Sequence, residues 1–206
     1  MTTLYFMRHA QSEANLGDIL ASQMDFPLTA QGYNDAKAIA EEFSQQHNIN
    51  KLIVSPLSRA QQTGAPFAEI FSLPITDDSR VIEQALGKYA GKTYAELDDE
   101  PNYCHDRSQR WGWVPEEGGE SYAMIVDRLQ PFFAELSVDG NDAILVITHA
   151  VTMRMIKAIL ANILPEYPHE IAHNGEVWKV EFKGVGQVHE ITSLLFGNSK
   201  EQVSRA

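Results

Sequence analysis

Two histidines stand close behind apolar runs, and one of them has an arginine beside it. Arg8 and His9 follow residues 4–7, and His149 comes shortly after residues 143–147. Such short apolar runs are typical of buried strands, and in open α/β sheets functional sites gather at the carboxyl ends of strands. A neutral histidine nitrogen can attack phosphorus, and the planar fork of an arginine can hold two oxygens. The sequence therefore predicts a site that binds and attacks a phosphoryl group.

Two further charged residues fit the same chemistry. A phosphoryl group in transfer spreads negative charge over its oxygens, and a protein must meet that charge with fixed cations and donors. Arg59 comes shortly after the apolar run 51–54, near the start of a predicted helix whose N-terminus adds backbone N–H donors. Glu83 lies just after the next strand region, and a carboxylic acid there can protonate the leaving oxygen.

The order of apolar patterns predicts the elements that must position these residues. We expect strands at 2–8, 51–54, 74–76 and 143–147, helices at 30–47, 56–71, 121–136 and 150–163, and a closing hairpin made by 176–182 and 187–191. Thr29 and Ser121 are the predicted N-caps of two of these helices. Strands that alternate with helices predict a mostly parallel central sheet in a three-layer α/β/α sandwich, with an antiparallel edge.

The length of 206 residues predicts one domain, 1–206, with an insert at about 88–120. The insert has no clear periodicity, and we interpret it as a lid or specificity insert. Arg107 and Arg110 with Trp111 and Trp113 suit a substrate-binding face for a phosphate ester with a ring or a second anionic group. Tryptophans that merely pin a surface excursion are an equally open alternative.

Composition limits the partners. The net charge of −12 excludes non-specific binding to nucleic acid or anionic lipid, but a few focused arginines still suit a small phosphorylated substrate. The chain has no run of about 20 apolar residues and no secretory apolar region, so we expect a cytoplasmic protein without a membrane segment. Its single cysteine, Cys104, allows no intramolecular disulfide and disfavours a cysteine metal cage. Nothing in the sequence indicates an oligomeric state.

One motif favours different chemistry. Residues 169–173 match the H-E-x-x-H pattern of zinc proteases, which needs both histidines on one face of a sustained helix and a third ligand. Pro165 and Pro168 precede the motif and Gly175 follows it closely, so we expect only a short turn of helix before an edge strand. The zinc protease remains the minor alternative.

Taken together, the motifs resemble those of the histidine phosphatase superfamily, the phosphoglycerate mutase-like proteins. The matching segments lie in the family's order between residue 4 and about residue 155: Arg8-His9-Ala10 with Asn15, 27–32 as Pro-Leu-Thr-x-x-Gly, 55–63 around Arg59, Glu83 with Gly87 and Gly91, 119–121, and 148–150. The resemblance implies a metal-independent phosphomonoesterase without a cofactor, which transfers the phosphoryl group in line, first to histidine and then to water.

The resemblance also implies a role for each matched residue. The catalytic residues are His9 as the phosphohistidine, Glu83 as the proton donor and His149, which also binds phosphate. The phosphate-binding residues are Arg8, Arg59, Asn15 and, more weakly, Ser12. Glu120 is a rival carboxylate for the acid, or else a residue near the start of a helix, where negative charge is favourable.

Departures from the family pattern bear on the substrate. Ala10 and Ala150 replace two glycines, and each is expected to add a methyl group near the phosphate and narrow the pocket. Residues 89–91 read Tyr-Ala-Gly instead of Trp-Glu-Gly. Mutases carry basic and aromatic residues where 84–86 are small and mostly apolar, which favours a phosphatase. A mutase and a non-catalytic phosphate-binding module remain alternatives, and sugar phosphates, nucleotide-like phosphates, phosphoserine and phosphoproteins remain open as substrates.

Overall fold

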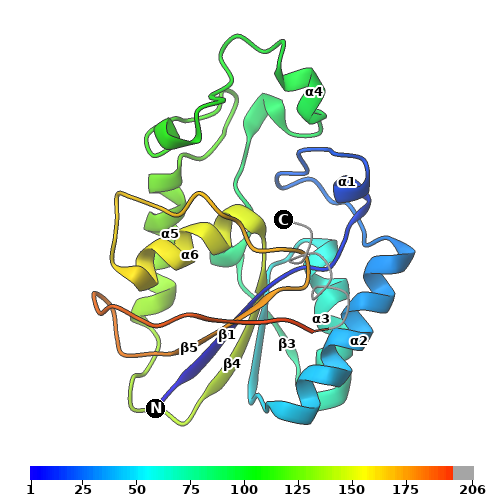
Figure 1. Ribbon diagram of the computed structural model, residues 1–206, viewed down its shortest axis with the longest axis vertical. Helices are drawn as coiled ribbons and strands as arrows, with labels where there is room; N and C mark the ends of the chain where they lie inside the picture. The colour runs from blue at the N-terminus through cyan, green and yellow to red at the C-terminus, as the bar shows by residue number, and fades with distance from the viewer. Residues whose placement is uncertain (197–206) are drawn as a thin grey trace.

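The central sheet lies between two layers of helices in the computed structural model, which describes residues 1–196 (Figure 1). Its six strands are β1 (Thr3–Arg8), β2 (Lys51–Val54), β3 (Ile75–Asp77), β4 (Ala143–Thr148), β5 (Val177–Glu181) and β6 (Thr192–Leu194). Their order is β3-β2-β4-β1-β5-β6, in which the first four pair in parallel and the pairs β1–β5 and β5–β6 are antiparallel. The predicted mostly parallel sheet with an antiparallel edge is confirmed.

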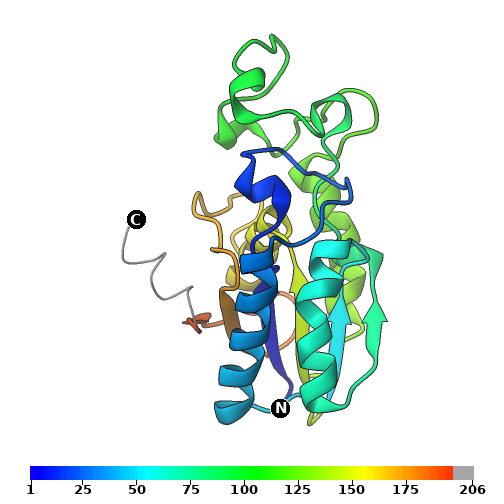
Figure 2. The same cartoon turned by 90° about the vertical axis from the view of Figure 1, so that its right-hand side faces the viewer.

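The long helices cover both faces of the sheet, as the α/β/α prediction requires. The helices α2 (Ala30–Gln46) and α3 (Ser58–Phe71) lie on one face, in front in Figure 2, and α5 (Tyr122–Ala134) and α6 (Ala150–Ala161) lie on the other. Side chains alternate along a strand, so Leu4 and Phe6 of β1 enter the core under α5 and α6, whereas Tyr5 and Met7 enter the core under α2 and α3. Each face of β1 is therefore buried, which explains its continuous apolar run.

Local capping sets where the helices begin and end. Thr29 caps α2 by accepting from the Gly32 N–H, and Ser121 caps α5, as predicted. The helix predicted from Pro56 begins at Ser58 instead, where the Ser58 N–H donates to the Asp25 carboxylate.

The predicted second strand of the hairpin, 187–191, was wrong. His189 sits in a loop where its ring accepts from the Lys183 N–H and its own N–H donates to the Leu160 carbonyl at the end of α6. These bonds hold the segment against α6 instead of against β5. The edge strand β6 therefore begins only at Thr192.

The insert 88–120 stands above the carboxyl ends of the parallel strands, at the top of Figure 1. It contains α4 (Tyr94–Leu97) and the short 3₁₀ helix η3 (Arg107–Gln109). Trp113 packs in a small cluster with Tyr89 and Tyr103, and Trp111 packs against the main core. The two tryptophans therefore anchor the insert, and the cavity below it is lined by the arginines instead.

Candidate active site

A cavity of about 390 Å³ lies between the carboxyl ends of the strands and the insert. Its walls contain six of the seven predicted site residues: Arg8, His9, Ser12, Asn15, Arg59 and Glu83. The seventh, His149, is fully buried behind the wall, with its ring centroid 5.1 Å from that of His9. The two histidines meet because β1 pairs in parallel with β4, and the His9 N–H continues that ladder by donating to the Thr148 carbonyl at 3.0 Å.

The ring of His9 is held in one tautomer. Its Nδ1 lies 2.7 Å from the Ala10 carbonyl oxygen, which can only accept, so Nδ1 carries the proton and Nε2 carries the lone pair. Burial lowers the pKa of His9 well below 6.5, and the nearby Arg8 and Arg59 cations lower it further. His9 is therefore neutral at pH 7, as a nitrogen nucleophile must be.

His149 is oriented by a hydroxyl group. Its Nε2 lies 2.7 Å from Ser55 Oγ, which also accepts from the Leu57 N–H at 3.5 Å. When the Ser55 hydroxyl donates to Nε2, the proton of the neutral ring is on Nδ1. This Nδ1 is buried without a partner among residues 1–196, and burial beside Arg59 lowers the pKa of His149 well below 6.5. His149 thus offers an unused donor next to His9.

Arg8 and Arg59 are held by neutral carbonyl groups. Arg8 Nη1 donates to the Ala172 carbonyl at 2.8 Å, and Arg59 donates to the Met24 and Ser22 carbonyls at 2.8 and 2.7 Å. The Nε atoms of both arginines are buried with no partner in the described chain. Burial lowers the pKa of each arginine, while the Glu83 carboxylate opposes that shift. Both guanidinium groups therefore keep donors and charge available for an anion.

The amide of Asn15 has a fixed direction. Its Oδ1 accepts from the backbone N–H and the hydroxyl of Ser12, at 3.1 and 3.0 Å, and from Asn174 Nδ2 at 3.1 Å. Three donors on Oδ1 identify the other amide atom as the NH₂ group, in a side chain that lines the cavity. Both donors of Ser12 are used on Asn15, so Ser12 acts on the site by holding Asn15.

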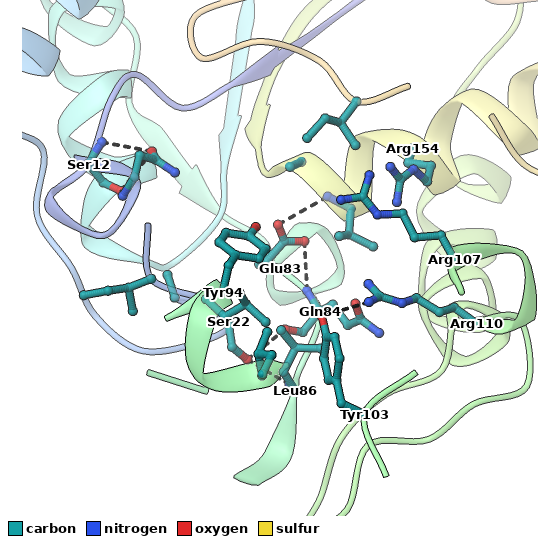
Figure 3. A pocket seen from close by; sticks show the side chains of 18 of the residues that line it. Ser12, Ser22, Glu83, Gln84, Leu86, Tyr94, Tyr103, Arg107, Arg110 and Arg154 are labelled. Carbon is teal, nitrogen blue, oxygen red and sulfur yellow. Dashed lines mark hydrogen bonds between the residues drawn. The ribbon is translucent and has the colours of Figure 1, made fainter. Parts of the chain in front are cut away.

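The two candidate carboxylates lie in different surroundings. Glu83 lines the cavity and accepts from the backbone N–H groups of Val151 and Thr152, at the N-terminus of α6. Glu120 does not line the cavity, and its carboxylate pairs with Arg128 at 2.9 Å. Figure 3 shows Glu83 in the middle of the pocket. The geometry favours Glu83 over Glu120 as the acid.

The two alanines that replace glycines differ in position. Ala150 lines the cavity, as expected. Ala10 does not, because its side chain packs under the wall against Leu28 and Ala36 and is 1% exposed. The expectation that the methyl group lies near the phosphate is therefore wrong for Ala10.

Sequence reasoning missed Arg154 and Asn174. Arg154 lines the cavity from α6, although it is only 2% exposed. The sequence did carry a signal for Arg154: it is an arginine among the buried residues of an apolar helix, four residues after the cavity-lining Ala150. Asn174 carried no such signal, since its contacts to His9 and Asn15 arise only from folding.

The segment that carries the H-E-x-x-H motif is irregular, so the expected turn of helix is absent. Within residues 1–196, no three histidine, cysteine, aspartate or glutamate side chains form a group that could hold a metal ion. The backbone of this segment instead holds arginines, because the Ala172 carbonyl accepts from Arg8 and the His169 carbonyl accepts from Arg154 at 2.8 Å. The segment braces the site through its main chain.

The fold and the cavity define an α/β protein built to bind a phosphoryl group beside a neutral histidine. A family model described as "Histidine phosphatase superfamily (branch 1)" matches residues 4–192. The chain belongs to this superfamily, and it is a metal-independent phosphomonoester hydrolase. The predicted family and the phosphatase type are confirmed.

Two relatives carry phosphatase names. Phosphoserine phosphatase 1 of Hydrogenobacter thermophilus is 30% identical over 168 residues, which cover 79% of this chain and 78% of that protein. Glucosyl-3-phosphoglycerate phosphatase of Mycobacterium tuberculosis is 32% identical over 134 residues, which cover 65% of this chain and 59% of that protein.

Solved structures share the fold. A mycobacterial glucosyl-3-phosphoglycerate phosphatase solved with VO₃ has a TM-score of 0.80 at 24% identity, over 92% of this chain and 96% of that chain. A phosphoserine phosphatase of Entamoeba histolytica solved with phosphoserine has a TM-score of 0.79 at 22% identity, over 97% of this chain and 98% of that chain.

In the part of this chain that the structure describes, no helix is long and apolar enough to cross a membrane.

Proposed function

We propose that the chain hydrolyses small phosphate monoesters through a phosphohistidine on His9. The observation that carries the proposal is the bond from His9 Nδ1 to the Ala10 carbonyl, which leaves Nε2 unprotonated in a cavity with two arginines. A neutral, oriented imidazole beside fixed cations is what nucleophilic attack on a phosphoryl group requires.

In the first transfer, His9 Nε2 forms a bond to phosphorus while the bond from phosphorus to the ester oxygen breaks. The leaving oxygen takes a proton from Glu83. Oε1 of Glu83 accepts from two backbone N–H groups, whereas Oε2 accepts only from the Val151 N–H at 3.3 Å. Oε2 therefore has more room for the proton that is transferred. In the second transfer, water attacks the phosphohistidine, Glu83 takes back a proton, and phosphate leaves with His9 neutral again.

The phosphoryl oxygens need donors throughout both transfers. We assign them the unpartnered Nε atoms of Arg8 and Arg59, the amide NH₂ of Asn15 and Nδ1 of His149. Ser12 supports them by holding Asn15. Each of these donors is positioned by backbone or by neutral side chains, so each can meet charge as it develops without first breaking an ion pair.

The substrate class rests on the relatives and on the cavity. Relatives are named for phosphoserine and glucosyl-3-phosphoglycerate, which supports a small phosphorylated metabolite over a phosphoprotein. A mutase reaction is the second candidate, but no basic residue stands directly after Glu83 to hold a sugar-acid phosphate for return transfer. We expect no nucleic-acid or membrane partner and a cytoplasmic location.

Two experiments test the proposal. Hydrolysis of p-nitrophenyl phosphate should persist in EDTA, and a panel of phosphorylated metabolites then identifies preferred substrates. A phosphodonor should label the protein with an acid-labile, base-stable phosphate, and the label should vanish in His9→Ala. His169→Ala is the matched control, since the His169 side chain is exposed and lies outside the cavity wall. A label that survives in His9→Ala refutes the nucleophile, and an inactive protein that still binds phosphate supports a binding module instead.

A further inference from the structure

The cavity has a second group of cations beyond those assigned to the phosphoryl group. Arg107 and Arg110 reach it from the insert, and Arg154 reaches it from α6. Figure 3 shows the three arginines on one side of the pocket, across Glu83 from Ser12. The cavity of about 390 Å³ falls within the range of ~300–1,000 Å³ typical of small-molecule sites, so it holds more than a phosphoryl group.

Arg154 is a buried charge without an ionic partner. It is 2% exposed, and its terminal nitrogens donate to Tyr122 Oη at 2.9 Å and to the His169 carbonyl at 2.8 Å. Its Nε is buried and has no acceptor among the residues that the structure describes, and none of their carboxylates lies within ion-pair distance. A buried, unpaired charge is costly unless an anion joins it. Among the described residues, Arg154 therefore keeps one unused N–H donor at the wall of the cavity.

Arg107 and Arg110 differ in how far they are already engaged. Arg110 donates to the Cys104 carbonyl and to Tyr103 Oη, and it lies over the Trp113 ring, so it mainly stabilises the insert. Arg107 is exposed on η3, and within residues 1–196 its guanidinium has no hydrogen-bond or ion-pair partner. Arg107 therefore keeps its whole fork for a ligand, close to the mouth of the cavity.

We infer that Arg154 and Arg107 form a second anion subsite, which selects phosphate esters with a carboxylate on the alcohol part. The inference rests on the proposed function, since it needs the phosphoryl group at His9. One fixed N–H from Arg154 and the open fork of Arg107 suit the two oxygens of a carboxylate. A second phosphate group is the alternative anion, and the experiment separates the two.

The experiment compares substrates that differ in one group. O-phosphoserine is paired with O-phosphoethanolamine, which lacks only the carboxylate, and 3-phosphoglycerate is paired with glycerol 3-phosphate. A third pair, 1,3-propanediol bisphosphate and its monophosphate, tests a second phosphate. The carboxylate member of the first two pairs should have a kcat/KM higher by about 10- to 100-fold, the usual effect of a charge-assisted hydrogen bond. Equal kcat/KM values within both carboxylate pairs, or a preference only for the bisphosphate, overturn the inference.

Two variants test whether Arg107 and Arg154 cause the preference for substrates with a carboxylate. Arg107→Gln should reduce the ratio of kcat/KM within each carboxylate pair by about tenfold or more, and Arg154→Lys should also reduce it, because lysine has no Nε–H at that place. The ratio cancels any general loss of folded enzyme. Lys92→Gln is the matched control, a cation of the insert that pairs with Glu100 and lies outside the cavity wall, and it should leave the ratio unchanged.

Three further outcomes separate this inference from the proposed function. A ratio that survives Arg107→Gln and Arg154→Lys refutes the assigned subsite. Activity on p-nitrophenyl phosphate without any carboxylate preference overturns only the subsite. Absence of turnover on every phosphate ester overturns the proposed function, and the subsite with it.

Discussion

Replacing Glu83 by glutamine should separate the chemistry of this carboxylate from its structural contacts. Glutamine keeps an oxygen that can accept from the Gln84 and Thr152 N–H groups at 2.9 and 3.2 Å. Its NH₂ group would face the Val151 N–H, so that 3.3 Å bond is lost. A hydrogen bond whose loss leaves a backbone N–H unpaired costs about 1–3 kcal/mol, so unfolding by urea should show a loss of that size.

The catalytic effect of Glu83→Gln should depend on the leaving group. General acid catalysis contributes about 10²- to 10⁴-fold, and an alkyl phosphate, whose alkoxide leaves poorly, should lose about that factor in kcat/KM, which reports the first transfer. p-Nitrophenol leaves without protonation, so hydrolysis of its phosphate should fall much less. The measurement is kcat/KM for both substrates at pH 7 in wild type and variant, because hydrolysis of the shared phosphohistidine does not enter this quantity.

Glu120→Gln is the matched control for this prediction. Glu120 pairs with Arg128 outside the cavity wall, so its loss should lower stability and leave the ratio of alkyl to aryl rates unchanged. An equal fall for both substrates in Glu83→Gln would refute Glu83 as proton donor. A change of the ratio in Glu120→Gln instead would make Glu120 the acid.

Three other outcomes follow from packing and charge. Gly32→Ala should lower the free energy of unfolding in urea by about 1–3 kcal/mol or more, because a Cβ there would lie 2.0 Å from a backbone carbonyl oxygen after β1. An unchanged midpoint of the urea unfolding curve would contradict this packing. The free energy of unfolding should fall as the pH drops below 6.5, since the unfolded chain then binds protons that buried His9 and His149 refuse, and it should level off below their lowered pKa values. Denaturant titrations from pH 8 to pH 5 measure this pH dependence. If His149→Asn leaves the slope of the unfolding free energy against pH unaltered, the His149 ring does not contribute to it. Asn174→Ala should lower kcat/KM about tenfold and weaken inhibition by phosphate, because the Asn15 amide loses one of the three donors that orient it. If the variant loses only stability, the role of Asn174 is merely structural.

The strands and helices were predictable wherever one period dominated the sequence. The run 143–147 has apolar residues on both faces because β4 is buried on both sides, and the Thr29 cap fixed the start of α2 within one residue. The strand predicted at 187–191 failed because His189 bonds to α6 through its backbone N–H and its ring. Local pattern cannot reveal such a tertiary competitor.

The site was predictable where a residue type implies its chemistry and was missed where only geometry does. His9 and Arg59 stand out because each lies in a motif that resembles the histidine phosphatase superfamily, and the motifs follow in the family's order. Ala10 was misplaced because the sequence does not say which way a side chain turns after a strand ends. Asn174 was missed because an asparagine before a glycine usually marks a turn, and here it also bonds to the carbonyl of His9 at 2.9 Å.

The way the arginines are held explains how a chain of net charge −12 presents a cationic cavity. Outside the cavity, Arg80 pairs with Asp78 and Glu135, and Arg128 pairs with Glu120, so their charges are neutralised.

The five arginines of the cavity are Arg8, Arg59, Arg107, Arg110 and Arg154. In the described part of the chain, none of the five has a carboxylate within ion-pair distance, and four of them are fixed by carbonyl or hydroxyl oxygens. A neutral acceptor fixes the direction of a guanidinium group without cancelling its charge, so the field of the cavity stays available to the substrate. Two of these acceptors are carbonyls of the segment 169–173, whose side-chain pattern suggested a metal site. The contribution of that segment lies in its backbone, which a sequence motif cannot display.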